Sequence, residues 1–157
     1  MLTAAITVIA AELIYFLVTT LFDLRPLNNV RDAAPAEKRQ EVAINLPIMA
    51  VPVALLTIGA ATGNPWPGYA AVAVQAIILL GGLSLWWMPY LAGLTVPWAT
   101  AGTGASWQEL HERTYAQTVI ILPRIADRPR PNLEHMILHS IMLAGLVLAV
   151  AVATGRP

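Results

Sequence analysis

The sequence has no cysteine and few charged residues, and both absences narrow the classes of protein to which it belongs. With no cysteine among 157 residues, disulfide bonds, thiolate catalysis, iron–sulfur clusters and cysteine-ligated zinc are excluded. Charged residues make up only 11% of the chain, against roughly 25% in an average soluble domain. Nine basic and nine acidic residues give no net charge, so no basic field attracts nucleic acid. A nucleic-acid partner is therefore not expected.

Apolar residues are instead abundant, and they gather in four long runs. They make up 57% of the chain, whose mean hydropathy is +0.65. A helix needs about 20 apolar residues to cross a hydrocarbon core of roughly 30 Å. The runs that are long enough cover about 2–22, 43–62, 69–91 and 133–154. We therefore expect an all-α integral membrane four-helix bundle that forms a single transmembrane domain over residues 1–157, with the lipid bilayer as its partner.

The basic residues predict how the spans are oriented. Eight of the nine Lys and Arg residues lie in the loops at about 23–42 and 95–131, and only Arg156 lies on the other side. Loops rich in Lys and Arg stay in the cytoplasm. Both N and C termini are therefore expected outside, in a multi-pass protein of the cell (inner) membrane. The first run lacks the basic start and cleavage site of a signal peptide, so it is expected to be retained.

The third loop and its flanks carry further local signals. Ser106 and Glu109 in "SWQE" form a capping box, which predicts an amphipathic cytoplasmic helix from about 107 to 122 between spans 3 and 4. Asn132 is a favourable N-cap for the fourth span. The third run ends in Trp86, Trp87 and Tyr90, an aromatic group typical of the position where a span meets the headgroups.

A polar stripe follows one face of the first span. It consists of Glu12, Tyr15, Thr19 and Asp23, whose spacing of three, four and four keeps them on one side of a helix. At a rise of about 1.5 Å per residue, Thr19 is level with His135 of the fourth span and Tyr15 with His139. An ionised carboxylate at mid-membrane costs roughly 2.5 kcal/mol or more. Glu12 is therefore expected to be protonated, paired or beside water, and a neutral carboxyl bonded to a neighbouring helix is the structural alternative.

Two histidines stand four residues apart in "LEHMILHS", at the start of the fourth span. His135 and His139 share one helical face, which is the geometry of a two-histidine metal site, and His111 is a candidate third ligand. The alternative is that the pair are polar residues at headgroup level that bond to neighbouring loops. A zinc protease is excluded, because Tyr115 stands where the HExxH pattern beginning at His111 requires its second histidine. Haem ligation would need a histidine from another element, since two on one helix cannot reach opposite faces of a porphyrin.

These residues define a candidate site in the cytoplasmic half of the bundle. The catalytic candidates are Glu12, Tyr15 and His139, the substrate-binding candidates are Thr19, Asn45 and Arg124, and the metal-ligand candidates are His111, His135 and His139. The leading hypothesis is a polar pocket that binds or acts on a small or lipidic molecule, with a divalent metal as the candidate cofactor. The alternative is a non-catalytic accessory subunit or small channel. Small residues on the helix faces favour a homo-oligomer or a subunit of a membrane complex.

In outline, a small chain with four spans, both ends outside and basic cytoplasmic loops resembles the MAPEG group of glutathione-dependent membrane enzymes. The second helix of that group carries an arginine, asparagine and glutamate pattern that faces the thiol cofactor. In "KRQEVAINLP" this chain has Arg39 and Asn45, and no acidic residue follows in the span. The resemblance is one of architecture, and it implies a four-helix membrane fold without assigning an activity.

Overall fold

The protein is described by a computed structural model, which covers residues 1–100, 106–115 and 117–155. Within these ranges the chain forms five α-helices and one short 3-10 helix, and no strand. They are α1 (Leu2–Leu21), α2 (Pro35–Thr62), α3 (Trp66–Ala92), η1 (Pro97–Thr100), α4 (Trp107–Tyr115) and α5 (Leu133–Ala153). The all-α class expected from the sequence is confirmed for this part of the chain. Arg156 and positions 101–105 of the third loop lie outside the described residues.

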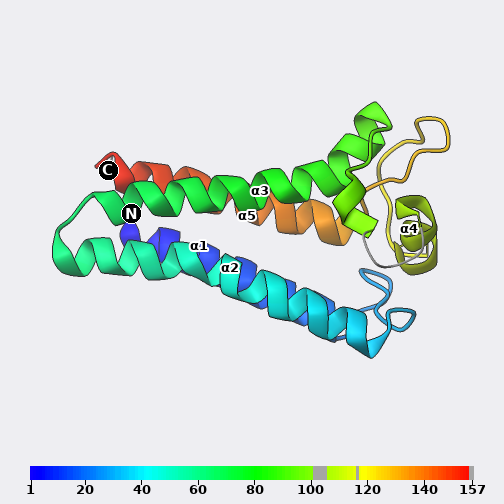
Figure 1. Ribbon diagram of the computed structural model, residues 1–157, viewed down its shortest axis with the longest axis horizontal. Coiled ribbons are helices and arrows are strands. Elements are labelled where there is room, and N and C mark those ends of the chain that lie inside the picture. Colours follow the sequence, from blue (N-terminus) through cyan, green and yellow to red (C-terminus); the bar gives the residue numbers. More distant parts are fainter. Residues whose placement is uncertain (101–105, 116, 156–157) are drawn as a thin grey trace.

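The four long helices form a ring in which each one packs on two neighbours. α1 packs against α2 and α5, and α3 packs against the same two helices. The two chain ends and the α2–α3 turn lie together, at what we call the turn end (Figure 1). The opposite, loop end carries the first loop, α4 and segment 117–132. α1 and α5, the first and fourth predicted spans, are therefore neighbours.

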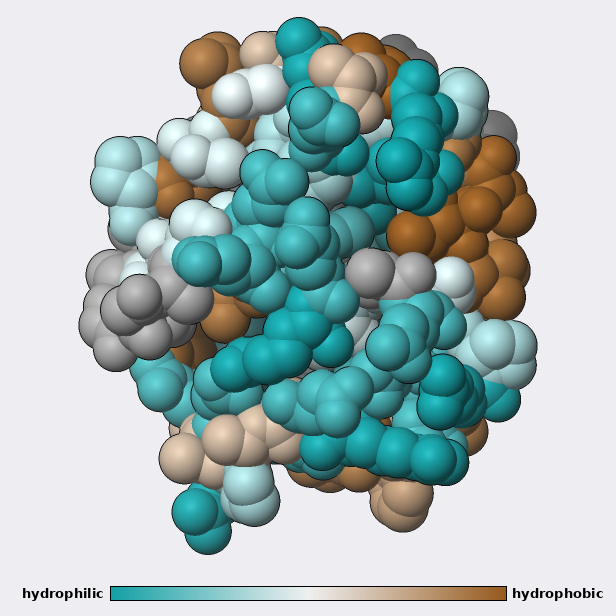
Figure 2. Space-filling view, turned by 90° about the vertical axis from the view of Figure 1, so that its right-hand side faces the viewer, coloured by the Kyte–Doolittle hydropathy of each residue, from teal (hydrophilic) through white to brown (hydrophobic). Residues whose placement is uncertain are grey.

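All four long helices are long and apolar enough to cross a membrane. Their outer faces carry exposed large hydrophobic residues, among them Ile14, Ile77 and Val147. Such a belt is unfavourable in water and is accommodated by lipid. The face of the loop end is different, because hydrophilic residues cover most of it and hydrophobic ones lie at its rim (Figure 2). These features are those of a membrane protein whose loop end meets water.

Both N-caps that the sequence predicts are confirmed. The Ser106 hydroxyl accepts a hydrogen bond from the Glu109 N–H at 3.2 Å, and the Glu109 carboxylate accepts one from the Ser106 N–H at 2.7 Å. The Asn132 side chain accepts a hydrogen bond from the His135 N–H at 3.1 Å. Because a cap satisfies backbone donors that the first turn leaves free, it fixes where the helix begins. The starts of α4 and α5 thereby set the heights of His111 and His135.

Two helix boundaries differ from the predicted ones. α2 begins at Pro35, well before residue 43, because proline suits the first helical turn and the Glu37 carboxylate accepts from the Ala34 N–H at 2.8 Å. α4 ends at Tyr115, well before the predicted end at residue 122. There the Thr118 hydroxyl donates to the Tyr115 carbonyl at 2.6 Å and so satisfies an acceptor at the end of the helix.

Segment 117–132 is held against the first loop after α4 ends. The Val119 N–H donates to the Pro26 carbonyl at 2.9 Å, and the Val119 carbonyl accepts from the Leu133 N–H at 2.8 Å. β-branched residues such as Val119 and Ile120 lose side-chain freedom in a helix, which favours these bonds over further helical turns. The segment therefore connects the first loop to the start of α5.

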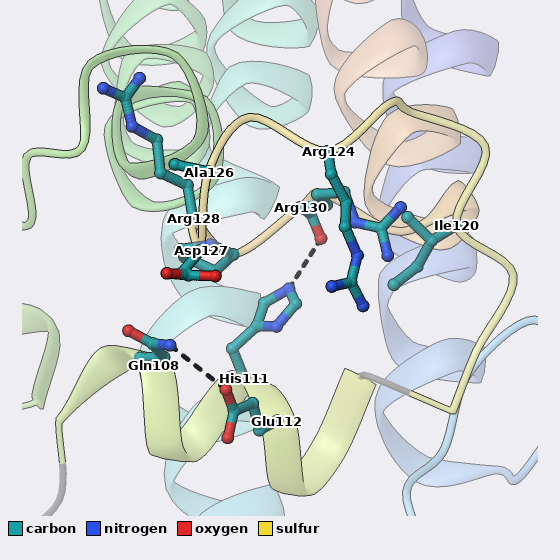
Figure 3. A pocket seen from close by; sticks show the side chains of 10 residues that line it. Gln108, His111, Glu112, Ile120, Arg124, Ala126, Asp127, Arg128 and Arg130 are labelled. Atoms are coloured by element: carbon teal, nitrogen blue, oxygen red, sulfur yellow. Dashed lines mark hydrogen bonds between the residues drawn. The ribbon is translucent and has the colours of Figure 1, made fainter.

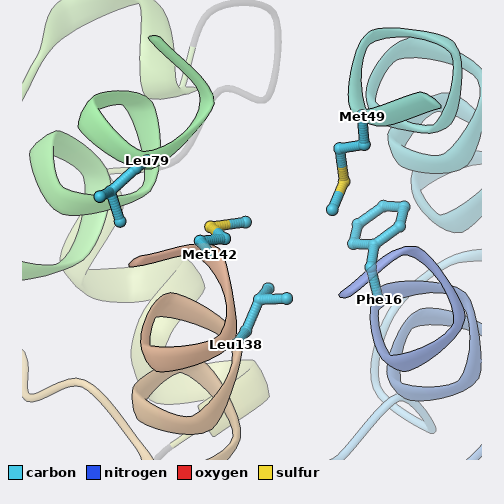
Figure 4. Close-up of a cluster of buried hydrophobic side chains, with 5 residues drawn as sticks. All are labelled: Phe16, Met49, Leu79, Leu138 and Met142. Atoms are coloured by element: carbon cyan, nitrogen blue, oxygen red, sulfur yellow. The ribbon is translucent and has the colours of Figure 1, made fainter. Parts of the chain in front are cut away.

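The packing of the core changes along the bundle. At the turn end the buried core consists of Ala5, Ile9, Leu56 and Ala71, and Gly68 of α3 lies next to Ala153 of α5. Small residues there allow the helices to approach closely. Nearer the loop end the buried residues are larger: Phe16, Met49, Leu79, Leu138 and Met142. The pair α3 and α5 diverges from the pair α1 and α2 toward this end (Figure 1), and the five side chains face one another across the space between the pairs (Figure 4).

Candidate functional site

A cavity of about 310 Å³ lies at the loop end of the bundle, and every α-helix contributes to its wall. Its apolar lining includes Phe16, Ile48, Met49, Ile77, Leu138 and Met142. Its polar lining includes Thr19, Lys38, Asn45, Glu134, His135 and His139. Ile48 of α2 and Ile77 of α3 are also exposed at the outer surface, at 46% and 66%. The cavity therefore reaches the lipid-facing surface between α2 and α3, and its volume falls in the range of ligand pockets.

His135 lies in the first turn of α5, within an aromatic cluster. Its ring stacks on Trp86 of α3 at a centroid distance of 3.5 Å, and Tyr115 of α4 meets it edge-on at 5.1 Å. Its Nδ1 lies 2.7 Å from Oδ1 of Asn132, an oxygen that also accepts from the His135 backbone N–H. Because that oxygen is an acceptor, Nδ1 carries the hydrogen, and Nε2 of a neutral ring is left as an acceptor.

His139, one turn further along α5, has the opposite arrangement. The indole N–H of Trp87, which can only donate, lies 3.0 Å from Nδ1 of His139. Nδ1 is therefore the nitrogen without hydrogen, the ring is neutral, and Nε2 carries the hydrogen. Gly82 of α3 provides the space for this ring, since a Cβ at residue 82 would lie 2.6 Å from Nε2. Both histidines are buried, at 9% and 6% exposure, and they contact α3.

Glu12 is in the middle of the bundle and is not part of the cavity wall. It is fully buried, and its Oε2 accepts from Nε2 of Gln75 at 2.7 Å. The same Gln75 amide donates to the Met142 carbonyl at 3.3 Å, so the pair connects α1, α3 and α5. The remaining oxygens, Glu12 Oε1 and Gln75 Oε1, are buried without a partner among the described residues. This contact is separate from the two histidines.

The other intramembrane candidates divide between the cavity and helix contacts. Thr19 lines the cavity, although its hydroxyl donates to the Tyr15 carbonyl of its own helix at 2.9 Å. Asn45 lines the cavity from α2. Tyr15 is not among the lining residues, and its hydroxyl donates to the Glu134 carbonyl at 3.2 Å, which fastens α1 to α5. The structure thus brings Thr19, Asn45 and the two histidines together and leaves Tyr15 in a helix contact.

His111 and Arg124 line a different hollow, of about 270 Å³, on the outside of the loop end (Figure 3). His111 Nε2 donates to the Arg130 carbonyl at 2.7 Å. Burial is the main cause that lowers the pKa of His111 below its ordinary value, since it disfavours the charged ring. Arg124 is exposed at the rim of this hollow. Neither residue is among those that line the cavity between the helices.

The three histidines are not arranged as a metal centre. Across the described residues, no group of three His, Asp or Glu side chains is placed to hold a metal ion. One ring nitrogen of each histidine is already engaged, by Asn132, by Trp87 and by the Arg130 carbonyl. A shared histidine-bound metal therefore stays a prediction from the sequence, and we derive no chemistry through one.

Two residues of the site were missed by sequence reasoning, both of them on α3. Trp86 is buried and contacts His135, His111, Trp107 and Tyr115, and Trp87 donates to His139, whereas the sequence assigned both tryptophans to the headgroup region. Gln75 lies inside the third span, where a polar side chain is expected to bond to a neighbouring helix, and its hydrogen bond to Glu12 confirms this expectation. The missed signal was a spacing of four, three, four and three, which places Gln75, Leu79, Gly82, Trp86 and Pro89 on one inward face.

The site is thus an open-sided cavity, apolar over much of its wall, with two buried imidazoles among its polar groups. Comparison with known proteins gave no matching family model, no matching curated protein and no matching solved structure. What the protein does must therefore be inferred from this cavity and the residues that line it.

Proposed function

We propose that this membrane protein binds a small amphipathic or lipidic molecule in the cavity at the loop end of its helix bundle. The observation that carries the proposal is the composition of the cavity wall. Leu138 and Met142 provide apolar contact on α5, and His135 and His139 provide polar groups on the same helix. Ligand pockets generally combine a mainly apolar wall with a few placed polar groups. A molecule with an apolar body and one polar end matches this wall.

The opening between α2 and α3 supports entry from the bilayer. Ile48 and Ile77 line the cavity and are also exposed on the apolar outer surface, so an apolar body need not cross a polar barrier to enter. Gly81 lines the cavity too, and a Cβ there would meet nothing within 4 Å. With the first and third loops in the cytoplasm, as the basic residues predict, the bound molecule belongs to the cytoplasmic leaflet of the cell membrane.

The alternative of a small channel has less support. A water path through the bundle must pass its centre, where Glu12 and Gln75 are both fully buried and hydrogen-bonded to each other. Their contact also holds α1 against α3, which is a structural role. The cavity at the loop end, in contrast, has a side opening, and two buried histidines are part of its wall. Ligand binding therefore explains more of the polar residues at the loop end than a channel does.

Native mass spectrometry of the gently solubilised protein tests this function. Gly81→Leu fills the cavity from a position with open space, so the variant is expected to fold and to lose any co-purified small molecule. Ala73→Leu is the matched control, because Ala73 is an exposed residue of the same helix that does not line the cavity. We expect added ligand mass on the unchanged protein and on Ala73→Leu, and none on Gly81→Leu. Equal spectra for all three proteins would contradict the proposal.

A further inference from the structure

The two histidines of α5 present opposite hydrogen-bonding groups to one cavity. The bond from Nδ1 of His135 to Asn132 leaves Nε2 of that ring as an acceptor. The bond from Trp87 to Nδ1 of His139 makes Nε2 of that ring a donor. Neither Nε2 atom has a hydrogen-bond partner among the described residues. A buried polar group normally has a partner, so both nitrogens are available to a bound molecule.

The neutral form of His135 follows from its surroundings. Its Nδ1 is 2.7 Å from the uncharged amide oxygen of Asn132 and 3.9 Å from the Glu134 carboxylate. The shorter contact is made to the neutral group, and the ring is stacked on Trp86 within an apolar cluster. A charged imidazolium there would lose its hydration without a close carboxylate in return. The acceptor role of Nε2 is therefore the favoured one.

We propose that the bound molecule is an apolar compound that ends in a hydroxyl group, which donates to His135 Nε2 and accepts from His139 Nε2–H. This inference rests on the proposed binding function and names its ligand class. The two ring centroids lie 6.1 Å apart and both histidines line the cavity, so a single small polar group placed between the rings is near both of them. A hydroxyl both donates and accepts through a single oxygen.

Other polar ends match the pair less well. Ether, ester and ketone oxygens only accept, and so they satisfy His139 and leave His135 Nε2 unpaired. A carboxylate or phosphate also only accepts, and its charge would be buried beside neutral rings. Lys38, a cation in the cavity wall, would attract such an anion toward α2 instead. An alcohol is the simplest end group that satisfies both histidines without adding charge.

The face of α5 also indicates where the apolar body lies. His135, Leu138, His139 and Met142 all line the cavity and follow the spacing of three, one and three that keeps them on one side of the helix. Along this face Leu138 lies between the two histidines, and Met142 lies nearer the middle of the bundle. A hydroxyl held between the rings would therefore leave its chain against Leu138 and Met142.

Three compounds that share a twelve-carbon chain separate the contributions of the two hydrogen bonds: 1-dodecanol, its methyl ether, and dodecane. Saturable binding is measured on the full chain in lipid nanodiscs, with empty discs subtracted for partition into lipid. We expect 1-dodecanol to bind roughly tenfold more tightly than the ether, because the ether leaves a buried nitrogen unpaired. The ether is expected to bind more tightly than dodecane, because it still accepts from His139.

Histidine nitrogen chemical shifts provide a test that needs no substitution. On adding 1-dodecanol to the ¹⁵N-labelled protein, we expect the Nε2 resonances of both His135 and His139 to move, whereas the methyl ether moves that of His139 alone. As a matched pair of variants, Trp87→Phe removes the donor that fixes His139, and Trp66→Phe changes an exposed tryptophan at the start of α3. Trp87→Phe is expected to weaken 1-dodecanol binding several-fold, and Trp66→Phe to leave it unchanged.

The outcomes separate this inference from the function on which it rests. Equal affinity for 1-dodecanol, its ether and dodecane, with unmoved histidine resonances, would overturn the hydroxyl ligand and leave the cavity as a site for another apolar molecule. No saturable binding of any of the three, together with equal mass spectra for Gly81→Leu and the unchanged protein, would overturn the proposed function itself. The predicted order of affinities with both histidine shifts would support both.

Discussion

Gln75 of α3 donates a hydrogen bond to the Glu12 carboxyl of α1 at 2.7 Å, and both side chains are fully buried at the centre of the bundle. The second oxygen of each side chain has no partner among the described residues. One hydrogen on the Glu12 carboxyl would give the Gln75 oxygen a donor and complete a two-bond pair, as a neutral acid and an amide form. The contact is therefore best explained as a link between helices.

Replacement of Glu12 distinguishes a neutral carboxyl from a charged one. Glu12→Gln is expected to keep thermal stability in detergent close to that of the unchanged protein, because an amide is neutral and can still pair with Gln75. Glu12→Ala should lower stability by about 2 kcal/mol or more, since it leaves a gap and an unpaired amide. Infrared spectra should show a protonated-carboxyl band that Glu12→Gln removes. Equal destabilisation by the two substitutions would contradict the neutral pair.

Gly81 and Gly82, two consecutive residues of α3 in the cavity wall, offer a matched pair of substitutions. Alanine at either position gains about 1 kcal/mol of helix propensity. A Cβ at Gly82 would lie 2.6 Å from Nε2 of His139, whereas one at Gly81 meets nothing within 4 Å. Gly82→Ala should therefore displace the His139 ring and weaken the bond from Trp87, with a net loss of stability and a shifted Trp87 indole resonance. Gly81→Ala should leave that resonance in place. An equal shift of the Trp87 indole resonance in both variants would contradict the close contact between Gly82 and His139.

The docking of α4 should depend on pH through His111. Burial lowers the pKa of His111 below its ordinary value of 6.5 in the folded protein. As pH falls through 6.5, His111 in the undocked α4 therefore takes up a proton that it does not take up in the docked form. The docked state of α4 is thus stabilised above that pH and loses this stability below it. The protection factors of the α4 amides, which are exchange rates corrected for the intrinsic effect of pH, should therefore fall on acidification. His111→Gln, which keeps a donor for the Arg130 carbonyl, should reduce this dependence of α4 protection on pH. An unchanged pH dependence in the variant would contradict His111 as its cause.

Asn132 connects the start of α5 with the connecting segments and with His135. Its amide donates to Thr118 at 3.0 Å while its oxygen accepts from the His135 N–H and ring. Asn132→Ala should destabilise the protein by about 1 to 2 kcal/mol through the lost cap. Asn132→Ser should recover part of this, because serine is also an N-cap. Chemical denaturation measures both effects, and a fully stable alanine variant would contradict the role of the cap.

How far the sequence predicts the site can be seen on α5. The apolar runs predict the four long helices, and Asn132 predicts where α5 begins, because span length and caps are local properties. The rise per residue predicts the heights of His135 and His139 along α5, and α1 is indeed a neighbour of that helix. Depth does not fix rotation about the helix axis, however. The histidines contact Trp86 and Trp87 of α3, while Glu12 pairs with Gln75.

That rotation is set by packing between helices, which no single segment contains. The gap at Gly82 admits the His139 ring, and the Trp86 face receives that of His135. The end of α4 at Tyr115 is likewise decided by distant contacts, since the residues that follow bond to the first loop. Residues whose partners lie on another element were therefore the ones that sequence reasoning misplaced.

Photolabelling in a bilayer tests most directly whether the cavity admits an amphipathic molecule. A long-chain alcohol that carries a diazirine on its chain is irradiated with the protein, and labelled residues are mapped by mass spectrometry. Met49 and Met142 line the cavity and are only 3% and 5% exposed, so only a molecule that enters the cavity can reach them. We predict label on these two residues, reduced by excess 1-dodecanol. Label confined to lipid-facing residues such as Leu143 and Val147, with none in the cavity, would contradict the account.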